Sequence, residues 1–272
     1  MKEVKRWFTT HSTLGLYAVR QSMQHRFSFF SSFLIMLIQP VIVYAIWQQV
    51  FLDQSVVANL SGSDMVTYLI ISQSINCMYG FQSSTERQIM SRVRSGDIAL
   101  DLVKPLHFVG ARFFETFGFL LIQLAFSLFL VMLALFLFPA FRMPSSLWTF
   151  FPFLVSVFLG FMILFSISMM TGMISFKTLN ITGIVYGRKA IVDFFSGALI
   201  PISLFPTWLT TLSKFLPFQG IIYIPTMIFL EKMSARELVL SLASQFLWVF
   251  ILLGLSSIVC KRAMRKVTIH GG

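Results

Sequence analysis

Charged residues are scarce in this sequence. Asp, Glu, Lys and Arg make up only 11% of its 272 residues, whereas 57% of the residues are hydrophobic. Charged side chains make up about 25% of an ordinary soluble domain, so the composition excludes that class. Several apolar runs reach the roughly 20 residues that a helix needs to cross the hydrocarbon core of a bilayer. The expected fold class is therefore an all-α integral membrane protein.

Cysteine and histidine are also rare. The two cysteines, Cys77 and Cys260, lie in different apolar runs, and nothing in their spacing indicates a disulfide or a metal site. We interpret both as packing residues and expect no metal. The histidines are scattered and have no acidic residue at a suggestive spacing: His11, His25, His107 and His270. A lipid-modifying membrane enzyme would use a histidine or paired acids at the interface, so this class is the weakest of those considered.

Acidic residues are almost absent from the apolar runs. Apart from Asp64, the first residue of one run, only Glu115 and Asp193 fall within their limits, each near one end and close to a basic residue, Arg112 or Lys189. A secondary transporter driven by protons or sodium usually needs ionisable groups inside the membrane. Local ion pairing is the favoured use of both acids, and an ion-coupled secondary transporter is therefore kept only as the alternative function.

Six apolar runs are long enough to span a membrane. A further run at 207–232 is apolar too, but prolines divide it into pieces of about ten residues, too short to cross. We expect this run to form a re-entrant hairpin that enters from the outer face. A pair of helices lying flat at the interface is the alternative. The predicted spans are residues 29–52, 64–84, 113–138, 148–176, 190–206 and 240–260.

The basic residues predict the orientation. Cytoplasmic segments of membrane proteins are enriched in Lys and Arg, and six spans with the amino terminus inside put 17 of the 21 basic residues on the cytoplasmic side. Only four fall outside: Arg142, Lys214, Lys232 and Arg236. Both termini are thus expected to be cytoplasmic. The net charge of +11 then reflects orientation and contact with anionic membrane lipids, rather than binding of nucleic acid.

The chain before the first span carries an amphipathic pattern. Apolar residues recur there at helical spacing, which is typical of a helix in the inner headgroup layer: Leu16, Val19, Met23 and Phe27. A soluble helix packed on the rest of the chain is the alternative. The predicted division of the chain is an interfacial helix at 1–28, a six-span domain at 29–260 and a basic cytoplasmic tail at 261–272.

The largest cytoplasmic loop, residues 85–112, has a defined pattern. Gly96 is suited to a sharp turn, and Asp97 can cap the short helix "IALDLVK" that follows it. This helix places Ile98 and Leu102 on one face and must end near Pro105. A plain solvated loop is the alternative.

These motifs, in this order and topology, resemble the membrane subunits of ATP-binding-cassette transporters of the ABC-2 class. Such permeases have six spans and a Glu-Arg pair after the second, followed by Gly-Thr-Leu and a proline nine residues beyond the glycine. Here the counterparts are Glu86-Arg87, "GDI" at 96–98 and Pro105. Asp97 replaces the hydroxyl residue, and extra residues precede the glycine. "GDIALDLVKPL" is closest to a branch whose permeases often occur as two unlike subunits.

The resemblance implies that the short helix is a coupling helix, seated in a groove of a separate ATP-hydrolysing subunit. No cofactor is expected in this chain, because it lacks a G-x-x-x-x-G-K-[ST] phosphate loop; ATP and Mg would bind the partner ATPase. The residues assigned to ATPase coupling are Glu86, Arg87, Gly96, Asp97, Ile98, Asp101, Leu102 and Pro105.

The resemblance further implies an exporter in a bacterial cytoplasmic membrane, with two ATPase copies and a second permease, unlike or identical. The chain itself would be a transport subunit without catalytic residues, moving a hydrophobic or amphipathic substrate. Polar residues inside the spans are candidates for the substrate path, although such side chains also bind helix to helix in lipid: Gln39, Gln48, Gln73 and Asn76.

Overall fold

A computed structural model describes residues 60–80, 82–103 and 108–265, together with 56–57 and three isolated helical positions, Ile42, Ala45 and Gln49. The predicted interfacial helix and nearly all of the first predicted span lie outside the described residues. The described part is almost entirely helical. It also holds two short antiparallel strands, β1 (Val56–Val57) and β2 (Leu60–Ser61).

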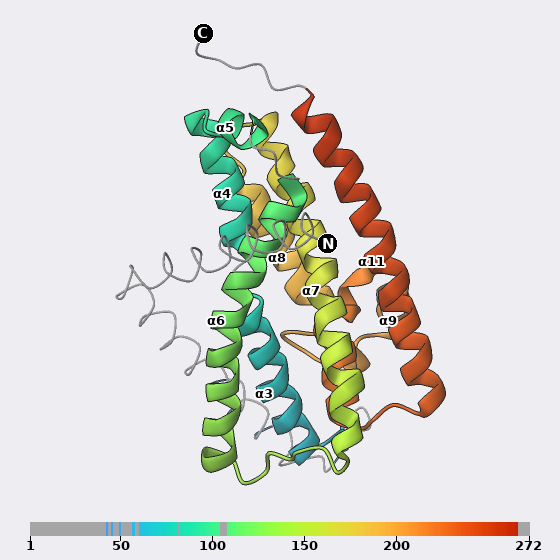
Figure 1. Cartoon of the computed structure of the whole chain (residues 1–272). Coiled ribbons are helices and arrows are strands. Elements are labelled where there is room, and N and C mark those ends of the chain that lie inside the picture. Colours follow the sequence, from blue (N-terminus) through green and yellow to red (C-terminus); the bar gives the residue numbers. More distant parts are fainter. Residues whose placement is uncertain are drawn as a thin grey trace, which may run out of the picture.

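Three long helices run along the molecule (Figure 1): α6 (Phe108–Leu137), α7 (Phe150–Met173) and α11 (Ala235–Met264). Short 3₁₀ turns, η1 (Leu147–Thr149) and η2 (Ile174–Phe176), extend α7 at its two ends. Each of the three continuous helical stretches is 30 residues long and apolar enough to cross a membrane, with a length of about 45 Å. They correspond to the predicted spans at 113–138, 148–176 and 240–260.

The predicted span at 64–84 is two helices rather than one. A capping box of Ser61 and Asp64 begins α3 (Gly62–Met78), and α4 (Gln82–Ser95) follows after a turn. The turn is closed by the Gly80 amide, which donates to the Cys77 carbonyl at 2.9 Å. The prediction of one continuous helix was therefore wrong at its carboxyl end. Apolarity alone did not reveal the break, because both sides of it are helical.

The predicted span at 190–206 is also not a continuous helix. Helix α8 (Thr182–Phe195) ends before Gly197, whose φ of +81° is a left-handed conformation that favours glycine. An irregular stretch then leads to η3 (Ile202–Leu204). A Cβ at Gly197 would lie 2.7 Å from the hydroxyl of Tyr68 on α3. The helix ends here because the chain must turn where it passes close to α3.

The apolar run at 207–232 folds into three short pieces, α9 (Thr207–Lys214), η4 (Pro217–Gly220) and α10 (Tyr223–Phe229). None is long enough to cross a membrane alone. Ile221 and Ile222, between the last two pieces, are buried in the main apolar core. The Gly220 carbonyl accepts a 2.6 Å hydrogen bond from the buried side-chain amide of Gln245 on α11. Irregular backbone within a membrane is stable only where protein groups form hydrogen bonds with its amides and carbonyls.

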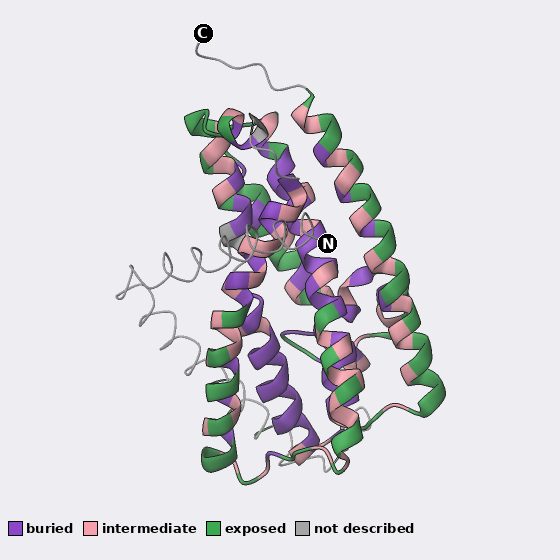
Figure 2. Cartoon of the chain, in the orientation of Figure 1, coloured by how far each residue is buried: buried purple, intermediate pink, exposed green. Residues whose placement is uncertain are grey.

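Burial differs sharply between the helices (Figure 2). Helix α3 is buried along nearly all its length, whereas α6 and α11 expose many residues. The exposed positions on the latter two are largely apolar, for example Phe136 and Phe250. Since water would disfavour these side chains, the pattern is that of a membrane protein with α3 in its interior and apolar outer faces on α6 and α11.

Candidate functional site

The predicted cytoplasmic loop contains the turn and short helix that the sequence indicates. Helix α4 ends at Ser95, Gly96 has a φ of +79°, and α5 (Ile98–Val103) follows. Figure 1 places α5 at the same end of the molecule as the end of α11, where the basic tail begins. Pro105 lies outside the described residues, and α5 ends two residues before it.

Asp97 begins α5 through its backbone rather than its side chain. Its carbonyl accepts from the amides of Leu100 and Asp101, at 3.0 and 3.3 Å. Its carboxylate accepts a 2.7 Å hydrogen bond from the Ser95 hydroxyl. The sequence expects Asp97 to cap α5 with its side chain, whereas the carboxylate instead binds Ser95 and stabilises the turn that contains Gly96.

Asp101 holds α5 against two other helices. Its carboxylate pairs with Arg92 on α4 and lies 3.4 Å from a terminal nitrogen of Arg112 on α6. Arg112 also pairs with Glu115, one turn along α6, at 2.8 Å. Asp101 and Arg112 are both buried, so water screens their attraction less than at a surface. The described part of the predicted loop, α4 and α5, is thus tied by ion pairs to α6, and Arg92 and Arg112 are functional candidates that the sequence patterns did not identify.

The described side chains of α5 differ sharply in burial. Ile98 is 4% exposed and packs in an apolar cluster with Ile89 and Phe108. Leu100 is 64% exposed. Ile98, which the sequence assigns to ATPase coupling, therefore packs within this chain, because α4 and α6 cover that side of the helix. The side chain of Leu102 lies outside the described ones.

Glu86, near the start of α4, is fully buried. Arg188 on α8 contacts it at two points, with Nε 2.7 Å from Oε1 and a terminal nitrogen 3.4 Å from Oε2. Arg87, its neighbour in the sequence motif, is exposed. The structure therefore places Glu86 where it binds another helix of the same chain and has no surface to offer a partner protein.

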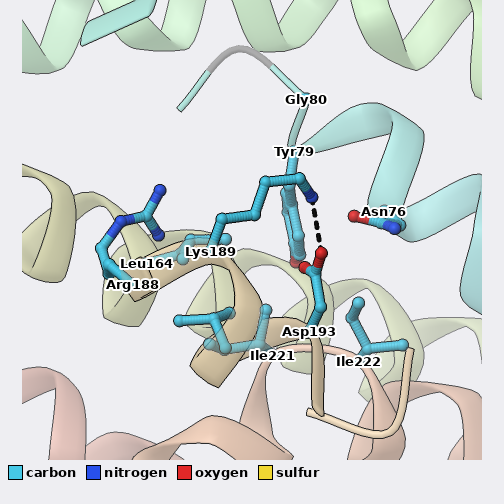
Figure 3. A pocket seen from close by; sticks show the side chains of 10 residues that line it. Asn76, Tyr79, Gly80, Leu164, Arg188, Lys189, Asp193, Ile221 and Ile222 are labelled. Atoms are coloured by element: carbon cyan, nitrogen blue, oxygen red, sulfur yellow. Dashed lines mark hydrogen bonds and ion pairs between the residues drawn. The ribbon is translucent and has the colours of Figure 1, made fainter. Parts of the chain in front are cut away.

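A small cavity of about 50 Å³ lies beside Arg188 (Figure 3). It forms where the break between α3 and α4 meets the irregular backbone at 221–222. Lys189 and Asp193, one turn apart on α8, form a 2.7 Å ion pair at its edge. The cavity is lined by Asn76, Tyr79, Gly80, Leu164, Arg188, Lys189, Val192, Asp193, Ile221 and Ile222.

The candidate path residues divide into three groups. Asn76 lines the cavity. Gln73 is buried, and its side-chain amide lies 3.5 Å from the Ala198 carbonyl, so it joins α3 to the turn after α8. Gln39 and Gln48 lie outside the described residues.

Glu115 and Asp193, the two acids of the apolar runs, are ion-paired with Arg112 and Lys189 as predicted.

Apolar helices along the molecule, a cavity between them and an ion-paired helix at one end define a polytopic membrane protein. Residues 37–271 match the family described as ABC-2 family transporter protein. The chain belongs to this family, which identifies it as an ABC permease. None of the curated proteins matches it. Membership of the family implies that the chain works with an ABC ATPase subunit.

Proposed function

We propose that this chain is the transmembrane permease subunit of an ATP-driven exporter, and that α5 is its coupling helix. Two ATPase copies bind ATP with Mg, and α5 sits in a groove of an ATPase subunit. A second permease, unlike or identical, completes the translocation path. The complex lies in a bacterial cytoplasmic membrane with both termini of this chain inside. The observation that carries the proposal is the ion-paired seating of α5 at one end of a chain of the ABC-2 family.

The pairing suits α5 to transmit force. An element that passes on movement must be firmly attached to the parts that it moves, and Asp101 attaches α5 to both α4 and α6. Its outward side presents Leu100, together with the exposed turn at Gly96 and Asp97. We assign these three residues to the ATPase contact, while Ile98 and Asp101 fix the helix from within. Glu86 contributes through the position of α4.

The cavity supports a substrate path in the same region. Its wall combines the end of α3, the middle of α8 and irregular backbone at 221–222. Interrupted helices that meet at a polar site are typical of transporters, because freed backbone groups and side chains can contact the cargo. Asn76 is the candidate path residue on this wall. The wall combines polar side chains such as Asp193 with apolar ones such as Leu164, which suits an amphipathic cargo. The re-entrant segment 207–232 would close the path towards the outer face.

Replacing Leu100 with Asp tests the docking role of α5. A carboxylate in a closed apolar contact would lose its hydration, so the ATPase should no longer copurify with the permease. Leu179, between η2 and α8, is a matched control because it is 63% exposed, compared with 64% for Leu100. Leu179→Asp should retain the ATPase. Equal retention by both variants, at normal membrane levels, would show that α5 is not the attachment element.

The number and identity of the permeases can be measured on the same preparation. Intact-complex mass analysis should find two permease chains and two ATPase chains per particle. Two copies of this chain would define a homodimer, and one copy beside an unlike permease a heterodimer. A particle with a single permease chain would contradict the proposed architecture.

A further inference from the structure

We propose that the Glu86–Arg188 ion pair is the joint through which α4 passes the movement of α5 to α8 and to the cavity wall. The inference rests on the proposed function, because it requires that an ATPase moves α5. It assigns a positioning role to two residues that lie away from the docking surface.

The first step is the continuity between α5 and Glu86. Helix α4 carries Glu86 near its start and Arg92 near its end, and Arg92 is paired with Asp101 of α5. A displacement of α5 therefore acts directly on the end of α4. Because a helix is stiff along its axis over a few turns, the displacement reaches Glu86 with little loss.

The second step is the geometry of the pair. Both carboxylate oxygens of Glu86 face the guanidinium of Arg188, at 2.7 and 3.4 Å. The contact at Oε2 is a hydrogen bond and the contact at Oε1 is an ion pair by distance, so both carboxylate oxygens attract the guanidinium. Since Glu86 is fully buried, the attraction is screened by little water. The pair therefore links α4 to α8.

The third step is that this contact reaches the cavity, whereas the neighbouring contacts of α4 do not. The hydroxyls of Thr85 and Thr116 on α6 form a hydrogen bond at 3.1 Å. Ile89 packs against Gly172 of α7 so closely that a Cβ added at Gly172 would lie 2.7 Å from Ile89 Cδ1. Neither Thr116 nor Gly172 is among the residues that line the cavity. Arg188 lines it directly (Figure 3). Of these three side-chain contacts of α4, the one with Arg188 would therefore carry movement of α4 to the cavity wall.

Stability alone gives little reason for such a pair. Burying two charges removes them from water, and apolar residues of similar volume often serve a fold equally well. If the pair instead holds two helices in a fixed relative position and passes movement from one to the other, its charges are needed for function. A purely structural pair and a transmitting pair therefore predict different results when both charges are replaced together.

The test uses the permease with its bound ATPase, and a thiol probe in the cavity that requires no knowledge of the cargo. Asn76→Cys is introduced in a chain that carries Cys77→Ala and Cys260→Ala. Its rate of reaction with a small methanethiosulfonate reagent is measured with and without ATP and Mg. We expect ATP to change the rate several-fold. Failure of the ATPase to bind, or no change in this parent, overturns the proposed function itself.

The joint is then removed in two ways. Glu86→Leu with Arg188→Met replaces the pair by apolar side chains, and Glu86→Gln removes one charge with little change of shape. In both variants the ATPase should remain bound and hydrolyse ATP, but ATP should no longer change the reaction rate of the thiol at position 76. Reversal of the pair, Glu86→Arg with Arg188→Glu, should restore part of the change. Lys232→Gln, which breaks the ion pair of Lys232 with Asp64 at 2.8 Å, is the matched control and should respond like the parent.

Three results would overturn the inference. The apolar double variant could keep the full ATP-dependent change, which would make the pair structural. The variants could lose the ATPase, which would place the pair in docking rather than in transmission. If the double variant and Glu86→Gln both failed to accumulate in the membrane while the reversed pair accumulated without an ATP response, the pair would serve folding alone.

Discussion

Lys232 Nζ lies 2.8 Å from Asp64 Oδ2 and so joins the turn after α10 to the first turn of α3. The adjacent residue, Glu231, has a φ of +56° and points its carboxylate at the segment before α7. It accepts hydrogen bonds from the amides of Ser145 and Ser146, both at 3.2 Å, and from the Thr149 hydroxyl at 2.6 Å. Two consecutive residues thus hold the starts of α3 and α7 at the end of the molecule opposite α5.

Replacing Glu231 with Ala should loosen the start of α7. The carboxylate receives several donors there, as an N-cap side chain does, and loss of an N-cap costs about 1 kcal/mol. The expected result is a slightly lower melting temperature of the purified protein and faster proteolysis at 145–149. Glu231→Gln should have a smaller effect, because an amide oxygen can still accept. An unchanged proteolysis rate for the alanine variant would contradict the role.

The effect of Glu231 should depend on pH. Hydrogen bonds from Ser145 and Thr149 lower the pKa of Glu231 from 4.5 to about 2. A carboxyl group whose pKa is lower in the folded state stabilises the fold above its unfolded pKa, and this contribution is lost as the pH falls through the folded value. The stability difference between the parent and Glu231→Gln should therefore be constant from pH 5 to 8 and shrink below about pH 4.5. Thermal unfolding at several pH values measures it.

Loss of the charge of Arg112 should detach α5 from α6. Arg112 is buried between Asp101 and Glu115, and removal of one partner of a buried ion pair typically costs 3–5 kcal/mol, here about 3. Arg112→Gln should therefore lower both the melting temperature and the yield of bound ATPase. Arg92→Gln should have an intermediate effect, since this arginine is 34% exposed. Arg94→Gln, at an exposed position on α4, is the control and should behave like the parent.

Position 96 should accept a larger side chain, but not a residue that disfavours the left-handed backbone conformation of Gly96. No atom lies within 4 Å of a Cβ built at Gly96, so the penalty comes from its φ of +79° alone. A β-branched residue in this conformation costs on the order of 1–3 kcal/mol, whereas Asn adopts it more readily. Gly96→Val should therefore weaken copurification of the ATPase more than Gly96→Asn. If the longer asparagine were the more harmful, crowding in the bound complex would be the cause.

The proposed orientation can be tested by thiol labelling in a chain without its native cysteines. Met143, between α6 and α7, and Ser95, beside α5, are both exposed and lie at opposite ends of the molecule. A cysteine at Met143 should react with an impermeant reagent added to intact cells, and one at Ser95 should react only after the cells are opened. The reverse pattern would show that α5 faces the outside and cannot meet a cytoplasmic ATPase.

Local features of the chain were predictable from the sequence. Length and apolarity predicted the long helices α6, α7 and α11, because a bilayer selects for both. The turn at Gly96 and the pairs of Arg112 with Glu115 and Lys189 with Asp193 followed from neighbours at short spacing. Each depends on conformations and contacts within one or two helical turns.

The tertiary structure decided the rest. Glu86 and Arg188 are 102 residues apart, and no periodicity relates them. The breaks after Met78 and Phe195 arise where other segments pass close by, as Tyr68 does at Gly197. Ile98 and Leu100 are similar side chains two positions apart, and only the packing of α4 and α6 around α5 buries one and exposes the other. An apolar sequence determines that helices enter the membrane, and long-range packing determines where they end and which of their few charges meet.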